Sequence, residues 1–249
     1  MKNTNAIITL LFLLLILAVP ANGQTGSNAL SSVNISGIDK ERLNRYDDFL
    51  KKEISEGRIP GAVSYIMRRG EIVHETAYGY SSLADKTPIR QDQLFHIMSM
   101  TKPIVTAAFM MLYEEGYFSL TDPVSKYLPQ FKNLQVAKNV DQGATGETEQ
   151  ANKEITINHL LTHTAGFSHG LGGTKLDNEI AKALYSEPHK DIESRVNAML
   201  EMPLIGHPGE QWYYSASPDV LALLIEHFSG MTTAEFLKDR IFDPLDMKD

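Results

Sequence analysis

Ser99 and Lys102 are the residues in this sequence whose types and spacing best fit covalent catalysis. No other serine in the chain has a lysine three positions later. Residues spaced i, i+3 lie on the same face of a helix, so the two side chains can form a hydrogen bond. A serine hydroxyl needs a nearby base before it can attack a carbonyl carbon. The spacing therefore indicates a nucleophilic serine with a lysine partner.

Lys102 can act as a base only if its pKa falls, because an ordinary lysine is protonated at neutral pH. Burial and a position at a helix N-terminus both disfavour its charged form. Another interpretation also fits the pattern: Ser99 caps a helix, and Lys102 extends its amine into solvent. The residues alone leave both interpretations open.

The segment that must position this pair is an apolar helix. Residues 103–115 are apolar nearly all round and end before Gly116, which predicts a buried helix. Pro103 is tolerated in a first helical turn, where its missing N–H would have no intrahelical partner. The helix is therefore predicted to begin close to Ser99, with the adjacent methionines packed around it.

Two other patterns could carry chemistry, but their contexts do not support it. Ser168 lies in G-x-S-x-G (residues 166–170), the nucleophile pattern of α/β-hydrolases, which requires a strand before the serine and a helix after it. Here a predicted helix precedes it and a loop follows. His159 and His163 have the i, i+4 spacing of a metal pair, but the segment lacks the glutamate of a metalloprotease helix and no third ligand is evident.

The remaining elements are predicted from periodicity and capping signals. Two of these elements are strands at 61–69 and 71–80 that form a hairpin. Their sheet needs further strands, since an isolated hairpin is marginally stable. The predicted elements are a helix at 39–56 capped by Asp39, strands at 61–69 and 71–80 joined by a turn at Arg69-Gly70, a mobile loop at 141–154, a short helix at 156–163, a helix from Ser217 to Gly230, and a last helix opened by a Thr232/Glu235 capping box and ending near Phe242.

The N-terminus has the composition of a secretory signal peptide. Lys2 precedes an apolar run at residues 7–19, and small residues follow at 21–23. The run is too short for an ordinary membrane span. We therefore predict a signal peptide at residues 1–23, cleavage near Gln24 and a secreted or periplasmic protein. An uncleaved membrane anchor is the alternative.

The composition excludes several functional classes. The chain has 249 residues, a net charge of −8 and no cysteine. Disulfides, cysteine-ligated zinc and a thiol nucleophile are therefore excluded. Without a basic stretch, nucleic-acid binding has no electrostatic support.

Several segments together resemble the β-lactamase-related serine hydrolases, which include AmpC-type β-lactamases, D-alanyl-D-alanine carboxypeptidases and family VIII carboxylesterases. The segments that carry the resemblance are LFHIMSMTKPIVTAAFMMLYEEGYFSLTDPVSKYLP, ITINHLLTHTAGF, PGEQWYYSASPDVLALLIEHFSG and IFDPLDMKD. The resemblance implies an α/β (α+β) fold of the β-lactamase/transpeptidase type, with an antiparallel sheet flanked by helices and a helical subdomain. It also implies that residues 24–249 form an incomplete domain, whose remaining strands we expect beyond Asp249.

The resemblance also implies the site. Ser99 would be the acylated nucleophile, Lys102 the partner that accepts or relays its proton, and Tyr214 the motif tyrosine that works with the lysine. Tyr213 is a possible alternative register for that tyrosine. The lysine and the phenol would titrate as a coupled pair, so sequence does not decide which is the base. No cofactor or metal is expected.

Two departures from the family pattern bear on specificity. The tyrosine motif is usually Tyr-x-Asn, but Ala216 stands in the third position and offers no amide to a substrate amide. The third motif, Lys or His, one residue, then Gly, is absent after Ala216. Its strand normally supplies the second N–H of the oxyanion hole, and losing such a donor costs about 10²–10³ in rate.

These observations predict an exported, esterase-like serine hydrolase that forms a covalent acyl-enzyme with a small ester or amide substrate. The first alternative is a non-hydrolytic or truncated relative that binds penicillin or peptidoglycan. The second is an α/β-hydrolase that uses Ser168. No nucleic-acid partner and no membrane span after signal cleavage are expected, and the oligomeric state is left open.

Overall fold

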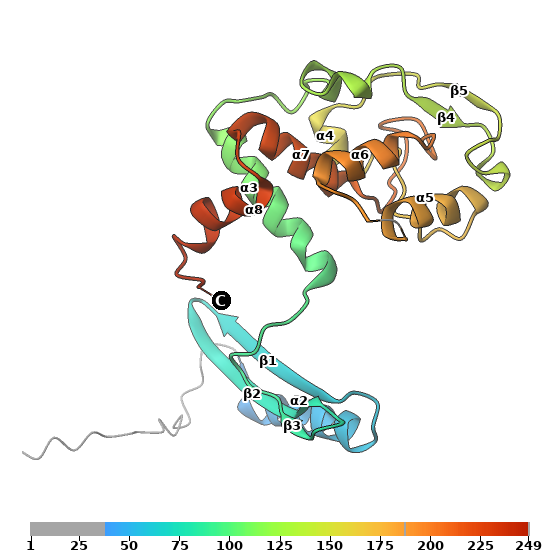
Figure 1. Ribbon diagram of the computed structural model, residues 1–249. Coiled ribbons are helices and arrows are strands. Elements are labelled where there is room, and N and C mark those ends of the chain that lie inside the picture. Colours follow the sequence, from blue (N-terminus) through green and yellow to red (C-terminus); the bar gives the residue numbers. More distant parts are fainter. Residues whose placement is uncertain (1–37, 187, 249) are drawn as a thin grey trace, which may run out of the picture. The chain divides into compact units, whose positions relative to one another are not determined.

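The computed structural model describes residues 38–186 and 188–248, in two compact units (Figure 1). The first unit ends at Gln93 and the second begins at Leu94. The predicted signal peptide and most of the segment after it lie outside the described residues.

The first unit is a helix with a small antiparallel sheet. Helix α2 spans Lys40–Ser55, β1 Gly61–Arg68, β2 Glu71–Ser82 and β3 Thr87–Pro88, with β2 in the centre. The Asp39 carboxylate accepts hydrogen bonds from the first-turn backbone, as predicted. Arg69 and Gly70 both have positive φ, which confirms the tight turn between β1 and β2. The short β3 was not predicted.

A buried chain of polar groups joins α2 to the hairpin. His74 Nε2 lies 2.8 Å from Asp47 Oδ1, and His74 Nδ1 lies 3.1 Å from Ser64 Oγ. The residue types are those of a hydrolase triad, but Ser64 is buried, with 5% of its surface exposed. We assign these three side chains a structural role, since their hydrogen bonds satisfy buried polar groups between α2, β1 and β2.

The second unit is mainly helical and contains one further pair of strands. Its elements are η1 Met98–Met100, α3 Thr101–Glu114, η2 Val124–Lys126, η3 Pro129–Phe131, β4 Gln135–Ala137, η4 Val140–Gln142, β5 Thr148–Gln150, α4 Ile157–Leu161, α5 Lys175–Tyr185, α6 Ile192–Leu200, α7 Ser217–Ser229, α8 Thr233–Leu237 and the π-helical turn η5 Lys238–Phe242. Strands β4 and β5 pair antiparallel, so part of the predicted loop at 141–154 is a strand. Helices α5 and α6 were not predicted.

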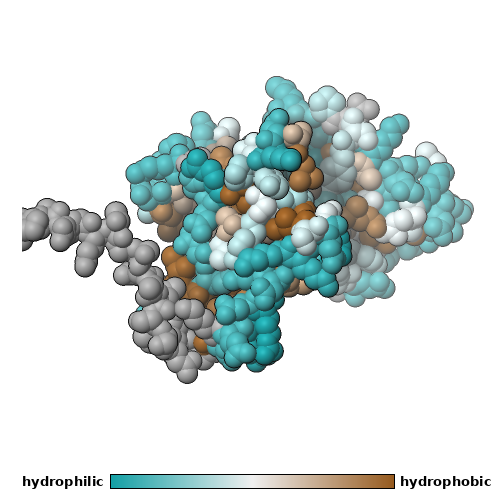
Figure 2. All heavy atoms as spheres, turned by 90° about the horizontal axis from the view of Figure 1, so that it is seen from below, coloured by the Kyte–Doolittle hydropathy of each residue, from teal (hydrophilic) through white to brown (hydrophobic). Residues whose placement is uncertain are grey.

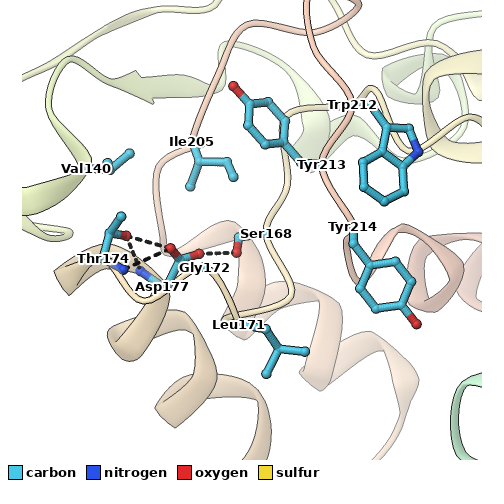
Figure 3. Close-up of a pocket in the computed structure, with 10 residues that line it drawn as sticks. All are labelled: Val140, Ser168, Leu171, Gly172, Thr174, Asp177, Ile205, Trp212, Tyr213 and Tyr214. Carbon is cyan, nitrogen blue, oxygen red and sulfur yellow. Dashed lines mark hydrogen bonds between the residues drawn. The ribbon is translucent and has the colours of Figure 1, made fainter.

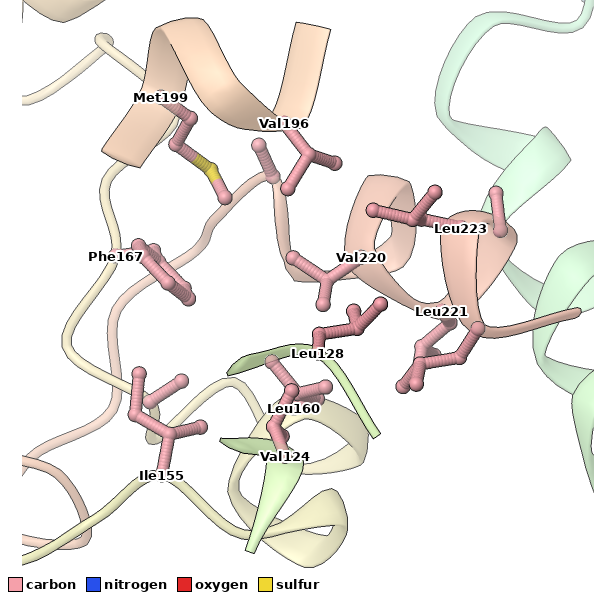
Figure 4. Close-up of a cluster of buried hydrophobic side chains, with 14 of the residues drawn as sticks. Val124, Leu128, Ile155, Leu160, Phe167, Val196, Met199, Val220, Leu221 and Leu223 are labelled. Atoms are coloured by element: carbon pink, nitrogen blue, oxygen red, sulfur yellow. The ribbon is translucent and has the colours of Figure 1, made fainter. Parts of the chain in front are cut away.

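Helix α3 packs against α7 in the hydrophobic core of the second unit, part of which Figure 4 shows. It buries Val105, Ala108, Phe109 and Leu112, whose i, i+3, i+4, i+7 spacing defines one helix face. Tyr113, by contrast, is 39% exposed. The prediction that the whole helix is buried was therefore wrong, because the core contacts only one of its faces.

Helix α7 is the most completely buried helix described. It begins at Ser217 and ends at Ser229, and Gly230 directly after it takes the left-handed conformation that glycine favours at a helix end. Its N-cap is Ala216, and its first residue is Ser217, where the sequence predicted the helix to begin. The capping box between Thr232 and Glu235 is confirmed, and the π-helical turn carries the last helical segment to Phe242.

Within the described part of the chain, no single helix is long and apolar enough to cross a membrane. Only α7 taken together with residues 233–242 meets the length and hydropathy requirements, and these two segments are bent by 82°.

Apolar side chains also lie at the surface, and Figure 2 shows them as brown patches among hydrophilic residues. Leu94, Phe95, Met98 and Met100 in the segment leading into α3 are more than half exposed. The prediction that Met98 and Met100 pack around this helix was therefore wrong.

Candidate active site

Ser99 lies in the middle of η1, which runs directly into α3. The nucleophile candidate is therefore next to the N-terminus of a long helix, where backbone N–H groups and the helix dipole favour negative charge. Met98 has a φ of 49°, in the left-handed region that is strained for a methionine. Such strain persists only where the surrounding structure holds the backbone in place, and it is found preferentially at functional sites.

Ser99, Lys102 and Tyr214 come together around one oxygen atom. Lys102 Nζ donates to Ser99 Oγ over 3.3 Å, and Tyr214 Oη donates to the same oxygen over 2.7 Å. The ammonium of Lys102 also lies 4.8 Å from the centre of the Tyr214 ring. The serine hydroxyl thus has two ionisable groups within reach, and either can take its proton once that group has lost its own.

The electrostatics of this cluster favour ionisation of the phenol. The adjacent Lys102 lowers the pKa of Tyr214 below its ordinary value, and the hydrogen bond with Ser99 acts in the same direction. Lys102 is half-buried, whereas Ser99 is exposed. The lowered pKa of Tyr214 makes this phenol a better proton acceptor for Ser99 than an ordinary tyrosine.

Tyr213, the alternative register, points away from this cluster. Its hydroxyl donates to Gln211 Oε1 over 3.0 Å. In Figure 3 the hydroxyl groups of Tyr213 and Tyr214 point in opposite directions. Tyr214 is therefore the tyrosine that the chain brings to Ser99.

The loop that carries Tyr214 is fixed on both sides of this residue. The Tyr213 N–H donates to the His163 carbonyl over 2.9 Å. On the other side, Ser215 Oγ lies 2.9 Å from His163 Nδ1 and 2.8 Å from Ser217 Oγ. These contacts anchor the phenol to the segment after α4 and to the start of α7.

His169 stacks on Tyr214. The two rings are nearly parallel, with centroids 5.2 Å apart, and Tyr185 stacks on the histidine at 5.5 Å. Burial lowers the pKa of His169, and the charge of Lys102 contributes. The lowered pKa favours the neutral imidazole, whose ring lies flat against the phenol ring of Tyr214.

Ser99 and Lys102 line a cavity of about 460 Å³. Ala216 also lines this cavity, where the family pattern has an asparagine. Arg195 Nε and Asp219 Oδ2 form an ion pair of 2.8 Å in its wall. The space around the nucleophile is thus apolar at position 216 and charged on another side.

The other candidates from the sequence have structural roles. Ser168 is buried and hydrogen-bonds to the carboxylate of Asp177, with no histidine in that contact. It lies in a loop that follows α4, so the strand–turn–helix context of an elbow is absent there. His159 completes the N-terminal cap of α4. Residues 38–186 and 188–248 contain no group of three or more His, Cys, Asp or Glu side chains placed to hold a metal ion.

Sequence reasoning missed the aromatic residues around Tyr214. His169 was considered only as part of the Ser168 pattern, and Tyr185 and Trp212 were not singled out. No spacing signal was available, because these residues come from three segments that meet only in the folded chain.

Comparisons with known proteins agree on one family. The Beta-lactamase family profile matches residues 45–249. Esterase EstB of Burkholderia gladioli is 31% identical over 208 residues, which cover 82% of this chain and 50% of the esterase. Penicillin-binding protein 4* of Bacillus subtilis (strain 168) is 31% identical over 183 residues, covering 72% of this chain and 35% of that protein.

Solved structures give the same result. EstCE1, described as a hydrolase with promiscuous acyltransferase activity, matches with a TM-score of 0.69 and 27% identity, covering 83% of this chain and 52% of EstCE1. The predicted β-lactamase/transpeptidase-like fold is thereby confirmed. The chain spans half or less of the length of these curated relatives. By sequence and by fold, the chain belongs to the beta-lactamase family.

Proposed function

We propose that the protein is an exported serine hydrolase of the esterase-like type, acting through a covalent acyl-enzyme on a small ester or amide. The observation that carries this proposal is the convergence of Lys102 Nζ and Tyr214 Oη on Ser99 Oγ. An activated serine requires a group that can take its proton within hydrogen-bond distance, and here two ionisable groups lie that close to one exposed hydroxyl at a helix start.

The mechanism has two halves. Ser99 Oγ attacks the carbonyl carbon while its proton passes to the Tyr214–Lys102 pair, and the backbone N–H of Ser99 stabilises the developing oxyanion. The pair then protonates the leaving alcohol, and an ester remains between Ser99 and the acyl group. In the second half, water gives a proton to the same pair and attacks this ester, which releases the acid and restores the serine.

Ala216 favours an ester over an amide substrate. Its side chain lines the cavity of Ser99 and has no group that could accept or donate a hydrogen bond. An ester has no N–H, so it loses nothing at this position. The name of a similar protein, Esterase EstB, supports the same choice.

Hydrolysis of p-nitrophenyl acetate tests the proposal. We expect the full chain to release p-nitrophenol and the Ser99→Ala variant to lose this activity. Ser119 is an exposed serine between α3 and η2, so the control variant Ser119→Ala should retain the activity. Activity that survives in Ser99→Ala but disappears in Ser168→Ala would instead support the α/β-hydrolase alternative.

A second candidate function is binding without turnover. It is favoured by Ala216, which offers no amide to a substrate amide. The similarity to penicillin-binding protein 4* supports a β-lactam or peptidoglycan ligand. Turnover of neither nitrocefin nor p-nitrophenyl acetate, together with a stable β-lactam adduct on Ser99, would favour binding over hydrolysis.

Export is part of the proposal and rests on residues 1–23 alone. N-terminal sequencing of the protein after secretion in a bacterial host tests it. We expect a mature N-terminus near Gln24, and an intact Met1 in the exported fraction would contradict cleavage.

A further inference from the structure

A cavity of about 510 Å³ has Tyr214 in its wall, but neither Ser99 nor Lys102 lines it. Figure 3 shows its wall, which is formed by residues from several loops and from α5. The lining residues are Val140, Ser168, Leu171, Gly172, Thr174, Asp177, Ile205, Trp212, Tyr213 and Tyr214. Its volume falls within the usual range for small-molecule sites, roughly 300–1,000 Å³.

Large apolar side chains give this cavity its character. Trp212 and Leu171 line it although 64% and 74% of their surfaces are exposed. Ile205 and Val140 add aliphatic surface to the same wall. Large apolar groups that stay exposed around a hollow are typical of a surface that binds a ligand.

Three polar side chains of the cavity, Ser168, Thr174 and Asp177, are already paired with one another. Ser168 Oγ donates to one oxygen of the Asp177 carboxylate, and Thr174 Oγ1 donates to the other over 2.7 Å. These bonds also hold the loop before α5 in place. A ligand therefore does not need polar groups to satisfy them, and the cavity suits an alkyl or aryl group.

Tyr214 connects the cavity to the chemistry. Its ring is part of the cavity wall, while its hydroxyl lies 2.7 Å from Ser99 Oγ. A group held against this ring is thus one side chain away from the nucleophile. A substrate whose carbonyl reaches Ser99 can therefore extend an attached apolar group into the cavity.

We propose that this cavity binds the apolar group of the ester substrate and sets the preferred length of that group, with Trp212, Leu171 and Ile205 as its specificity-determining residues. The proposal rests on the proposed ester hydrolysis at Ser99. It places the apolar group either on the acyl side or on the alcohol side of the ester, and the two arms of the experiment distinguish these cases.

Binding can be measured without turnover, because Trp212 is the only tryptophan in the chain. The Ser99→Ala variant of the full chain is titrated with methyl esters of acetic to octanoic acid in one arm and with methyl to octyl acetates in the other. We expect the longer esters of one arm to shift the Trp212 emission to the blue, as the indole loses contact with water. Emission that stays unchanged in both arms would overturn the proposal.

Kinetics on the unmodified chain give the second measurement. Each methylene buried in the cavity should raise kcat/KM about fourfold until the cavity is full. Leu171→Ala should flatten this dependence on length. Leu245→Ala removes a leucine of similar exposure, 66%, that lines neither cavity, and it should leave the dependence unchanged.

The two proposals fail in different ways. If Ser99 is not a hydrolytic nucleophile, hydrolysis is absent, but the fluorescence shift in Ser99→Ala still reports whether the cavity binds. If the cavity is not the specificity site, hydrolysis occurs with no length dependence that Leu171→Ala alters, and the Trp212 emission does not move.

Discussion

The chemistry of individual residues centres on which group takes the proton of Ser99. Both Lys102 Nζ and Tyr214 Oη are placed as donors to Ser99 Oγ, so one of them must lose a proton before the serine can give up its own. The lowered pKa of Tyr214 makes the phenol the group that does so more easily than an ordinary tyrosine. The ammonium of Lys102 is then the charge that stabilises the phenolate.

This assignment predicts the pH dependence of hydrolysis. Because the proton-accepting form of Tyr214 is deprotonated, kcat/KM should rise with pH through an apparent pKa below 10, the ordinary tyrosine value. Lys102→Met removes the stabilising charge, so the apparent pKa of this rising limb of the pH profile should increase toward 10. The rate should fall by about 10²–10⁴.

Lys126→Met is the matched control, because Lys126 Nζ lies 4.9 Å from the ring centre of Tyr127, a tyrosine that does not contact Ser99. The control should leave the limb in place. A limb that is the same in the Lys102→Met variant would contradict the assignment of the phenolate.

His169 is predicted to be a positioning residue that supports the Tyr214 ring. An aromatic pair contributes about 0.5–1.5 kcal/mol, so His169→Ala should lower kcat about two- to tenfold. His169→Phe keeps a ring in the stack and should restore most of kcat. KM for p-nitrophenyl acetate should change less than kcat in both variants.

The control is His227→Ala, at the far end of α7, where the ring contacts Tyr127 and Phe228. It tests whether the loss of any histidine in an aromatic cluster lowers kcat. Equal activity of His169→Ala and His169→Phe would contradict a role for the stack.

At the scale of elements, two loops determine where the phenol lies. The segment after α4 contains His163 and Gly166, and it meets the segment that leads from Leu204 to Tyr214. Gly166 has a φ of +85°, and a Cβ there would lie 2.1 Å from the carbonyl oxygen of Gly206. The Gly166 carbonyl also accepts from the N–H of Ile205 over 2.8 Å. The close approach of these backbones therefore depends on glycine.

Gly166→Ala should destabilise the fold by about 2 kcal/mol or more, since it combines left-handed strain with a clash against backbone. Gly173→Ala is the control: Gly173 has the same φ, +85°, but a Cβ would meet nothing within 4 Å. This variant should lose only about 1–2 kcal/mol. Urea denaturation measures both, and equal losses would show that the contact with Gly206 is unimportant.

Local signals in the sequence account for the elements that were predicted correctly. Asp39, the Arg69-Gly70 turn and the Thr232/Glu235 box each act within a few residues, so their geometry follows from nearby side chains. Helices α5 and α6 and the β4–β5 pair were missed. The strands have three residues each, and their pairing joins segments more than ten positions apart.

In the candidate site, too, local spacing predicts some residues and tertiary packing determines the others. Ser99 and Lys102 are three residues apart, so a helical spacing rule brings them together. Tyr214 lies 115 residues from Ser99, and only the family resemblance indicated it. The His169 stack and the Trp212 cavity depend on tertiary packing for which the sequence contains no spacing rule.

For the whole molecule, burial is distributed unevenly between the two units. In the described part of the first unit, Leu50 and Val73 are the buried large apolar residues. The second unit holds the large hydrophobic cluster, to which α7 contributes the residues from Val220 to Ile225. The candidate site lies entirely in this second unit, on elements that the cluster supports.

This distribution predicts unequal protection from amide hydrogen exchange. The amides in the interior of α7 should exchange only on global unfolding of the second unit, while those of β1 and β2 should exchange much faster through local opening. Mass spectrometry of deuterium uptake in peptides from 61–82 and 217–229 measures this. Equal protection of the two peptides would contradict the prediction.

The identity of the nucleophile is the central claim, and labelling with a fluorophosphonate probe tests it most directly. Peptide mapping by mass spectrometry after labelling should find one adduct, on Ser99, and the Ser99→Ala variant should remain unlabelled. An adduct on Ser168 or Ser64, or labelling of Ser99→Ala to the same extent as the unmodified chain, would contradict the account.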